Sequence, residues 1–412
     1  MPDLYGAGTY GSTTYGAGDP IVPPPPPPVV VVLPPGVSPT GTGVPARYQV
    51  RLFDPTTGLQ TAIFDDWNSL YYNLILDGTP QHIFSINGRD PRRSLFVVDA
   101  MLEVYRTDVL NGFSTLEYSG FHRSTQDQTN DKNDVLFTSF GRGYVDLTHR
   151  REILYFAGTP GDSKFGPADD VMKAYVRENA GSLATTANGR LRGGVTTGLG
   201  VAPDNSLGIF WAGSAAWKNL LDLLQQVSLH GSIDFDVQRT GPLTFQFNTY
   251  YPRLGIDRTV GSITTFAPEL GNMSLPFATT SRVEEANDVL VLGNGEGAAR
   301  VFRETQDLLA QGASPWNRIE RTHDSRDSTT LQQLDDVAQV QLNAWRATRH
   351  ITFQVLQSRA TAYGRDYRLG DLIVAKYKGI QEVKKIVGVE VTVANGREDI
   401  RVHFDDENAA IL

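Results

Sequence analysis

The chain has 412 residues, of which 40% are hydrophobic, and its formal net charge is −9. This length exceeds the usual size of one hydrophobic core, so we expect about two to four domains. Cysteine is absent, which excludes disulfides, thiolate metal sites and a cysteine nucleophile. The sequence has no apolar run of about eighteen residues and does not begin with a basic segment followed by an apolar one, so we predict neither a membrane span nor secretion through a signal peptide.

Basic residues are not clustered in the sequence. The longest basic runs are the pairs Arg92-Arg93, Arg150-Arg151 and Lys384-Lys385. Specific nucleic-acid binding needs grouped Lys and Arg side chains that displace counterions, so it is disfavoured here. Four methionines and seven scattered histidines offer little to a metal, and we predict no cofactor and no metal site.

Residues 1–45 differ in composition from the rest of the chain. Tyr5, Tyr10 and Tyr15 are separated by Gly, Ala, Ser and Thr, and prolines run from Pro23 to Pro28. Such a segment buries too little apolar surface to offset its ordering entropy, and the prolines favour a stiff, extended spacer. We predict an arm that a neighbouring molecule orders, with Tyr5, Tyr10, Tyr15, Pro23 and Pro28 as partner-binding residues. The alternative is a flexible or solubilising tail.

Residues 46–160 predict an all-β module. In "ARYQVRLF", Tyr48, Val50 and Leu52 alternate with polar residues, which is typical of a half-buried strand. The polar stretch "STQDQTNDKND" (124–134) predicts a long loop. Turn signals separate further predicted strands at 61–65, 70–76, 81–86, 95–106, 115–122, 134–138 and 152–156.

Residues 161–347 predict α/β structure. A helix is expected over 167–181 with Pro167 in its first turn, and another over 214–231, capped by Ser214 with Trp217 on its apolar face. A hairpin is expected over 232–247 and a third helix over 328–347, beginning at Ser328. Residues 182–209 predict an extended loop.

Residues 348–412 return to β-structure. Strands are expected at 350–356, 371–377, 382–394 and 399–404, with a hairpin turn at Asn395-Gly396. The predicted fold class is therefore mixed α+β and β-dominated: an extended arm, a β-module, an α/β insert and a second β-module.

The stretch "VLVLGNGEGAAR" suggests a dinucleotide-binding turn, because a strand runs into Gly293, Gly295 and Gly297. The spacing is Gly-x-Gly-x-Gly, however, and no acidic strand end follows about twenty residues later. We favour a glycine-rich connection between strands.

Two polar clusters suggest other chemistry. The first, in the loop at 124–134, offers oxygen ligands to calcium but lacks the glycine and the glutamate of a calcium-binding helix–loop–helix motif, so a solvated loop is favoured. His323, Asp324 and Ser325 are adjacent, but adjacency in sequence is not the geometry of a catalytic triad. The members of the first cluster are Asp127, Asn130, Asp131, Asn133 and Asp134.

Three stretches resemble, in order and spacing, a family of tail-tip or baseplate hub proteins of long-tailed bacteriophages. They are "LGIDRTVGSITTF" (254–266), "DVLVLGNGEGAARVF" (288–302) and "YGRDYRLGDLIVAKY" (363–377). The resemblance covers residues 46–405. The tyrosine-glycine repeats of the arm are similar to openings of phage tail proteins, but the arm departs from the common pattern, and its role is not implied by the family.

The resemblance implies two tail-tube-like β-barrel domains, at 46–160 and 348–412, with α/β domains inserted at 161–347. It implies a homotrimer whose six tube-like domains form a ring that continues the tail tube and adapts sixfold to threefold symmetry. The implied partners are a distal tail or tube protein above, tip or fibre proteins below and a tape-measure protein. The resemblance implies that the protein lies at the tail tip of the virion and that DNA only passes through the ring. It implies no catalytic residues in this chain.

Two other functions stay open from the residues alone. A cell-wall polysaccharide or peptidoglycan hydrolase needs only two carboxylates brought together by folding, which the 161–347 region can supply. A receptor-binding tail module is suggested by the tyrosines and the five tryptophans.

Overall fold

The computed structural model describes residues 46–405, apart from 109–111, 113, 130–134, 155–160, 185–198, 284, 327, 329, 359 and 395. These described residues belong to one compact unit. The proposed binding residues of the arm, Tyr5, Tyr10, Tyr15, Pro23 and Pro28, lie outside them, as do four of the five residues of the predicted calcium cluster.

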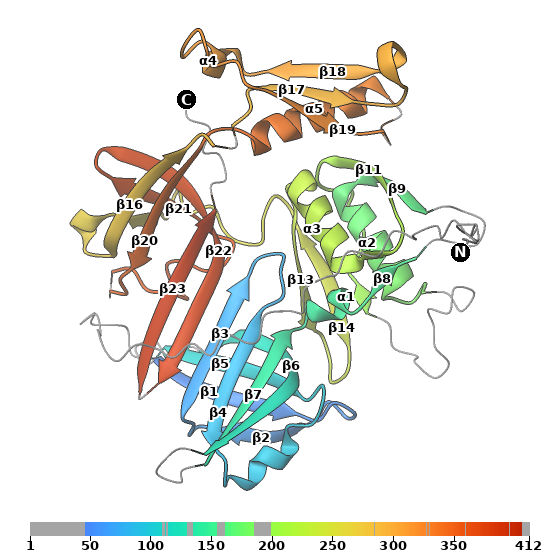
Figure 1. Cartoon of the computed structure of the whole chain (residues 1–412). Coiled ribbons are helices and arrows are strands. Elements are labelled where there is room, and N and C mark those ends of the chain that lie inside the picture. Colours follow the sequence, from blue (N-terminus) through green and yellow to red (C-terminus); the bar gives the residue numbers. More distant parts are fainter. Residues whose placement is uncertain are drawn as a thin grey trace, which may run out of the picture. The chain divides into compact units, whose positions relative to one another are not determined.

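An eleven-stranded sheet dominates the structure, in the order β15-β21-β22-β3-β4-β7-β6-β5-β1-β2, with β23 also paired to β22 (Figure 1). The strands from the first β-module are β1 (Ala46–Phe53), β2 (Gln60–Phe64), β3 (Ser69–Ile75), β4 (Gln81–Asn87), β5 (Met101–Asp108), β6 (Ser114–Thr129) and β7 (Val135–Gly143). The later strands are β15 (Thr265–Phe266), β21 (Leu372–Tyr377), β22 (Ile380–Ala394) and β23 (Arg397–Asp405).

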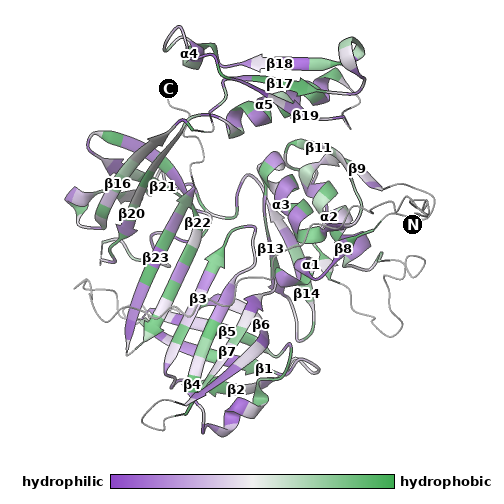
Figure 2. Cartoon of the chain, viewed as in Figure 1, coloured by the Kyte–Doolittle hydropathy of each residue, from purple (hydrophilic) through white to green (hydrophobic). Residues whose placement is uncertain are grey.

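The two β-modules meet inside this sheet. Antiparallel β3 and β22 pair with Tyr72 opposite Val391 and Leu70 opposite Val393, and all four side chains are buried. Polar and apolar residues alternate along these strands, as the colouring of β22 shows (Figure 2), so that one face of the sheet is apolar. That face belongs to a single core to which both modules contribute.

The α/β part packs two helices on short strands. Helix α2 (Ala168–Asn179) starts after Pro167 and has Asp169 and Asp170 in its first turn, which favours the helix dipole. Helix α3 (Leu220–Gly231) packs against it in a second core. The other elements of this part are α1 (Asp146–His149), β8 (Glu152–Ile153), β9 (Asp162–Pro167), β10 (Gly200–Val201), β11 (Phe210–Ala215), β12 (Lys218–Asn219), β13 (Asp234–Arg239) and β14 (Phe245–Tyr250). The short helix η1 (Pro91–Leu95) belongs to the first β-module, where it precedes β5.

A third, smaller core lies between helix α5 (Leu331–Ala344) and the sheet β18-β17-β19. These strands are β17 (Asp288–Leu292), β18 (Phe302–Gln306) and β19 (Glu320–Asp324), with η4 (Gly297–Ala299) and α4 (Leu308–Gln311) between them. Because β17 and β18 form an antiparallel hairpin, the glycines at 293–297 connect two strands, as we favoured, and not a strand with a helix.

Strand β16 (Met273–Ser281), which follows η3 (Pro268–Leu270), pairs antiparallel with β20 (Thr348–Val355). Strand β20 in turn lies beside β23. Thus β15 and β16, although inside the 161–347 stretch, join strands of the second β-module. The domain limits that we expect from the sequence stay a prediction.

The β-dominated fold and most predicted strands are confirmed, but four local predictions are wrong. Residues 124–129 continue strand β6 instead of forming a loop. Residues 96–100 precede β5 and are not strand. Helix α3 starts at Leu220 with Asn219 as its cap, not at Ser214, because Phe210–Ala215 pairs with β9. Trp217 has a φ of 57° and lies before the helix. Helix α5 is capped by Thr330, through a capping box with Gln333, and not by Ser328.

Candidate functional site: a polar sheet face with two open edges

One face of the strands β23, β22, β3, β4, β7 and β6 is polar, opposite the apolar core. Residues that lie directly opposite one another in an antiparallel sheet share a face, so the register traces rows across all six strands. One row is Arg397, Ala394, Ser69, Ser85, Thr138 and Gln126. The next is Asp399, Thr392, Tyr71, Ile83, Phe140 and Ser124. A third is Arg401, Glu390, Asn73, Gln81 and Arg142.

The charges on this face are of both signs and partly paired. His403 Nε2 lies 3.0 Å from Glu390 Oε1, and Arg401 Nε lies 3.5 Å from Asp399 Oδ2. Partial burial, with the nearby Glu390 carboxylate, raises the pKa of Tyr71. The face is therefore largely polar, with charges of both signs.

The sheet face ends at an open edge on β6. Strand β5 pairs with β6 as far as Phe121, and His122 exchanges backbone hydrogen bonds with Asp99 and Ala100. From Arg123 to Thr129, the described strands include only β7 as a partner of β6, on its other edge, and every side chain is exposed. Backbone groups on the outer edge of this segment are available to another strand.

A second open edge lies on β16, on the other side of the same group of strands. Among the described strands β16 pairs only with β20, with a bulge between Ser274 and Phe277. Leu275, in the bulge, has a φ of 48° and is 74% exposed, and Phe277 is 65% exposed. Large apolar side chains on an unpaired edge mark an interaction surface.

The first and third stretches that carry the family resemblance meet beside β21. A Cβ added to Gly255 would lie 2.1 Å from the carbonyl carbon of Gly370, so the two backbones touch. Asp371 accepts hydrogen bonds from Ile256 N (2.7 Å), Arg258 Nε (2.6 Å) and Arg368 N (2.9 Å). This buried carboxylate fixes the loop that leads to β15, which forms the end of the eleven-stranded sheet.

A buried polar junction joins the first module, the α/β part and β22. Asp77 accepts hydrogen bonds from Phe235 N (2.7 Å) and Ser228 Oγ (2.5 Å), and Lys385 donates to Asp234 over 2.8 Å. Burial, reinforced by the charge of Asp234, raises the pKa of Asp77 to about 7. These hydrogen-bonded residues join three parts of the fold, and they do not face a cavity.

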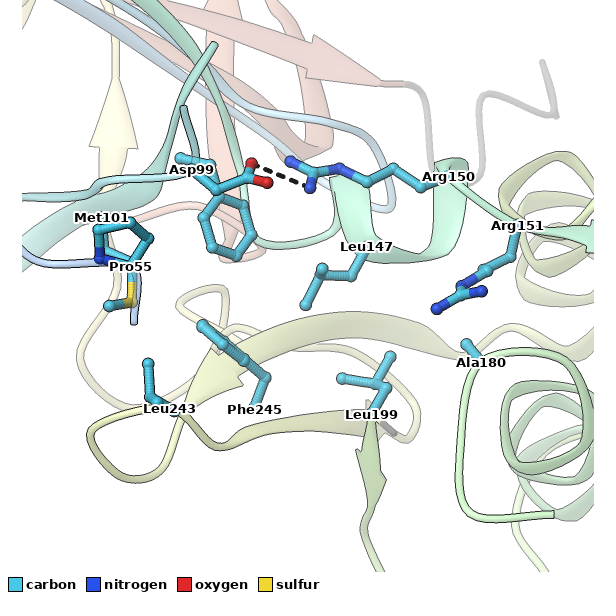
Figure 3. A pocket seen from close by; sticks show the side chains of 11 residues that line it. Pro55, Asp99, Met101, Leu147, Arg150, Arg151, Ala180, Leu199, Leu243 and Phe245 are labelled. Atoms are coloured by element: carbon cyan, nitrogen blue, oxygen red, sulfur yellow. Dashed lines mark ion pairs between the residues drawn. The ribbon is translucent and has the colours of Figure 1, made fainter. Parts of the chain in front are cut away.

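A half-open cavity of about 350 Å³ lies between the first module and the α/β part (Figure 3). Phe121, Leu147 and Phe245 give it a mainly apolar wall, and Asp99 is the only carboxylate among the residues that line it. Asp99 is engaged by Arg150 (3.0 Å) and by Arg123 (2.7 Å). The lining therefore offers no carboxylate pair for glycoside hydrolysis.

The family model of Siphovirus ReqiPepy6 Gp37-like proteins matches residues 49–404. The chain belongs to this family. The match includes all three stretches that carry the resemblance to phage tail proteins, and it confirms that resemblance. No curated protein is significantly similar to this Gp37-like protein.

Solved structures of tail proteins share the fold. A tail protein of Neisseria meningitidis MC58 is 13% identical with a TM-score of 0.56, covering 88% of this Gp37-like chain and 98% of its own. A 43 kDa tail protein of prophage MuSo2 from Shewanella oneidensis is 9% identical, with a TM-score of 0.55 and coverages of 87% and 98%. Prophage tail protein gp18 from Listeria monocytogenes is 9% identical, with a TM-score of 0.50 and coverages of 87% and 95%.

In the Gp37-like chain the adjacent residues His323 and Asp324 do not come together, and of the five-residue 124–134 cluster only Asp127 lies within the described residues. His323 packs against the Trp345 ring, whereas Asp324, on the opposite face of β19, pairs with Arg300. Asp127 pairs with Arg93. Within the described ranges no three ligand-type side chains come together for a metal, and no helix is long and apolar enough to cross a bilayer.

Sequence reasoning missed the polar face, the two open edges and the Asp77 junction. The alternation along 69–75, 81–87 and 388–394 marks the polar positions, but it does not say that these strands are neighbours. The register that joins them comes from pairing between residues more than 300 positions apart.

Proposed function

We propose that this Gp37-like protein is a structural hub at the tip of a phage tail. Three copies form a ring that continues the tail tube, adapts its sixfold symmetry to threefold tip parts and provides an attachment point for tip proteins. The two β-modules act as tube-like domains, each closing into a barrel-like unit within the ring. Neighbouring tail proteins lie above and below, and the tape-measure protein and DNA pass through.

One observation carries the proposal: the two β-modules share a sheet through β3 and β22, and open edges remain on the outer part of β6 in this sheet and on the nearby strand β16. Unpaired edges are a liability that a protein must cover or pair. A ring of copies removes them, since each copy meets the next through two different surfaces and the last returns to the first. The family membership and the fold support a place in the tail.

The polar face of the six strands lines the conduit in this proposal. Most of its row residues are polar or partly paired ions, with Ala394, Ile83 and Phe140 as apolar exceptions, so the face offers DNA phosphates few concentrated positive charges. A conduit for DNA needs a polar or acidic wall, and this face is polar with charges of both signs. The apolar faces of the same strands are already buried in the core.

The arm at 1–45 contributes to assembly in the same proposal. Its proline run spans to an adjacent tail subunit, and the rings of Tyr5, Tyr10 and Tyr15 supply contact area at low rotamer cost. Pro23 and Pro28 bound the run of prolines within this spacer. The arm thereby tethers the hub to its neighbour.

No catalytic role is part of the proposal. Two neighbouring buried carboxylates, Asp77 and Asp234, are held by backbone amides, Ser228 and Lys385 at the junction. They are used to join parts of the fold.

The test is the particle formed by the purified chain. Mass photometry over a range of concentrations, followed by negative-stain microscopy, is expected to give a ring with three times the 45.2 kDa mass of the chain. The same preparation should release no fragments from peptidoglycan. A monomer at every concentration, or turnover abolished by one Asp or Glu substitution, would overturn the proposed function.

A further inference from the structure

We propose that the outer edge of β6 in one copy pairs with the outer edge of β16 in the next copy, so that the polar sheet face continues across the subunit boundary. This inference rests on the proposed ring and assigns its seam. The two edges are the Arg123–Thr129 segment of β6 and the Phe277–Ser281 segment of β16.

The first argument is position. The strands β16, β20, β23, β22, β3, β4, β7 and β6 follow one another, by ladders or, between β20 and β23, by close approach. Among the described strands of this run, β22, β3, β4 and β7 have ladders on both sides, whereas β20 and β23 each have one ladder and approach one another without pairing. Its two ends, β16 and the outer half of β6, are open among the described strands. A ring needs two different complementary surfaces on each copy, and these two ends provide them.

The second argument is length and regularity. The open segment of β6 has six regularly paired residues, Ser124–Thr129, after a bulge at Arg123, and β16 offers five residues after its own bulge. Five paired residues are a typical strand length in globular proteins. Pro276, which has no N–H to donate, lies in the bulge and not in the regular segment, so it does not interrupt pairing there.

The third argument is that a strand from a different protein would leave one of the two edges unpaired. A different protein pairing with β16 alone would cover Phe277 but leave β6 open, and the reverse also holds. A second copy satisfies one edge of each molecule at once, and closure of the ring satisfies both. Self-pairing of two β16 edges gives an isologous dimer with β6 still exposed, so it is a distinct outcome.

Disulfide trapping tests the seam cleanly because the chain has no cysteine. Ala278→Cys is combined in turn with Thr125→Cys, Gln126→Cys and Asp127→Cys, which sample both faces of β6; all four positions are exposed. Opposed cysteines in paired strands come close enough for a disulfide. We expect at least one pair to form covalent trimers under mild oxidation, with yield about tenfold above that of Ala278→Cys with Leu229→Cys, an exposed site on α3.

A second variant tests the seam without relying on oxidation. Ala278→Lys together with Gln126→Lys places charges on both edges, as natural edge strands do to prevent pairing. Both sites are exposed, so the far-UV circular dichroism of the chain should be unchanged while the trimer fraction falls about tenfold at equal concentration.

The outcomes separate the seam from the ring. A trimer by mass with no β6–β16 disulfide in any pair, and with the lysine variant still trimeric, overturns the seam and leaves the proposed hub intact. Disulfide dimers from Ala278→Cys alone, at yields above the paired variants, overturn the seam in favour of β16 self-pairing. A monomer in the unmodified protein overturns the proposed function, and the seam with it.

Discussion

Arg106 of β5 forms a bidentate ion pair with Glu398 of β23, with Nε 2.7 Å from Oε1 and Nη2 3.1 Å from Oε2. The two side chains are only 5% and 14% exposed. Tyr48 donates its hydroxyl to the same carboxylate, and Arg106 also donates to the backbone oxygen of Tyr363. The pair therefore fastens strands of the two β-modules within their shared core.

Replacing Glu398 by Gln should destabilise the chain, because it leaves the Arg106 charge buried without its counter-ion. Loss of one partner of a buried pair costs about 3–5 kcal/mol. Urea unfolding of the purified chain measures the change in the free energy of unfolding. Glu320→Gln, on an exposed pair with Arg318, is the matched control and should cost less than about 1 kcal/mol. Equal effects of the two variants would contradict the role of the Arg106 pair.

Asp77 should make the stability of the junction fall as pH rises. The pKa of Asp77 is about 7 in the folded chain and has its ordinary value of 3.8 in the unfolded chain. Between these pH values the folded chain therefore binds one proton more than the unfolded chain. The contribution of Asp77 is fully present below about pH 4 and is lost as pH rises through 7. Asp77→Asn can still accept from Phe235 N and can donate to Ser228 Oγ, and it carries no buried charge.

Thermal midpoints of the two proteins between pH 5 and pH 8 check this prediction. We expect the thermal midpoint of Asp77→Asn to rise relative to that of the parent chain as the pH increases across this window. A difference that is constant with pH would show that Asp77 does not titrate in the folded chain.

Gly255→Ala should destabilise the loop that leads to β15, since the new Cβ would meet the backbone of Gly370 and Asp371. Backbone must move to relieve this contact, and overpacking of this kind costs about 1–3 kcal/mol. Gly261→Ala, in the same loop, is the control: its Cβ meets nothing within 4 Å, although its φ of 73° adds a strain of about 1 kcal/mol. Chemical denaturation should rank Gly255→Ala as the more damaging change.

Deletion of residues 2–35 should leave the ring intact and weaken its attachment to the adjacent tail subunit, because in the proposed function the arm makes the contacts to that subunit. Co-sedimentation of the hub with assembled tails measures attachment, and mass photometry reports the ring. Replacing Tyr5, Tyr10 and Tyr15 by Ser keeps the length and is expected to reproduce most of the loss. Unchanged incorporation of both variants would dispose of the arm's proposed role.

Local patterns predicted many elements because they record burial directly. Alternation placed β1, β3, β4 and β20 to β23 within a few residues, and helical spacing placed α2 and α5. The predicted start of α3 was wrong because Ser214 and Asn219 both suit a helix cap. Only the pairing of Phe210–Ala215 with β9 decides between them. The loop predicted at 124–129 was wrong because the polar residues of this segment are typical of a loop, whereas its pairing with β7 makes it a strand.

The sequence by itself determined the β-dominated class, the three family stretches and the absence of cysteine chemistry, because these follow from residue types and short-range order. Only the tertiary structure decided that β3 pairs with β22, that Asp371 holds the loop after Gly255, and that β6 and β16 keep open edges. These relationships join residues far apart along the chain. A strand's period specifies which face is buried, but it does not specify which strand lies beside it.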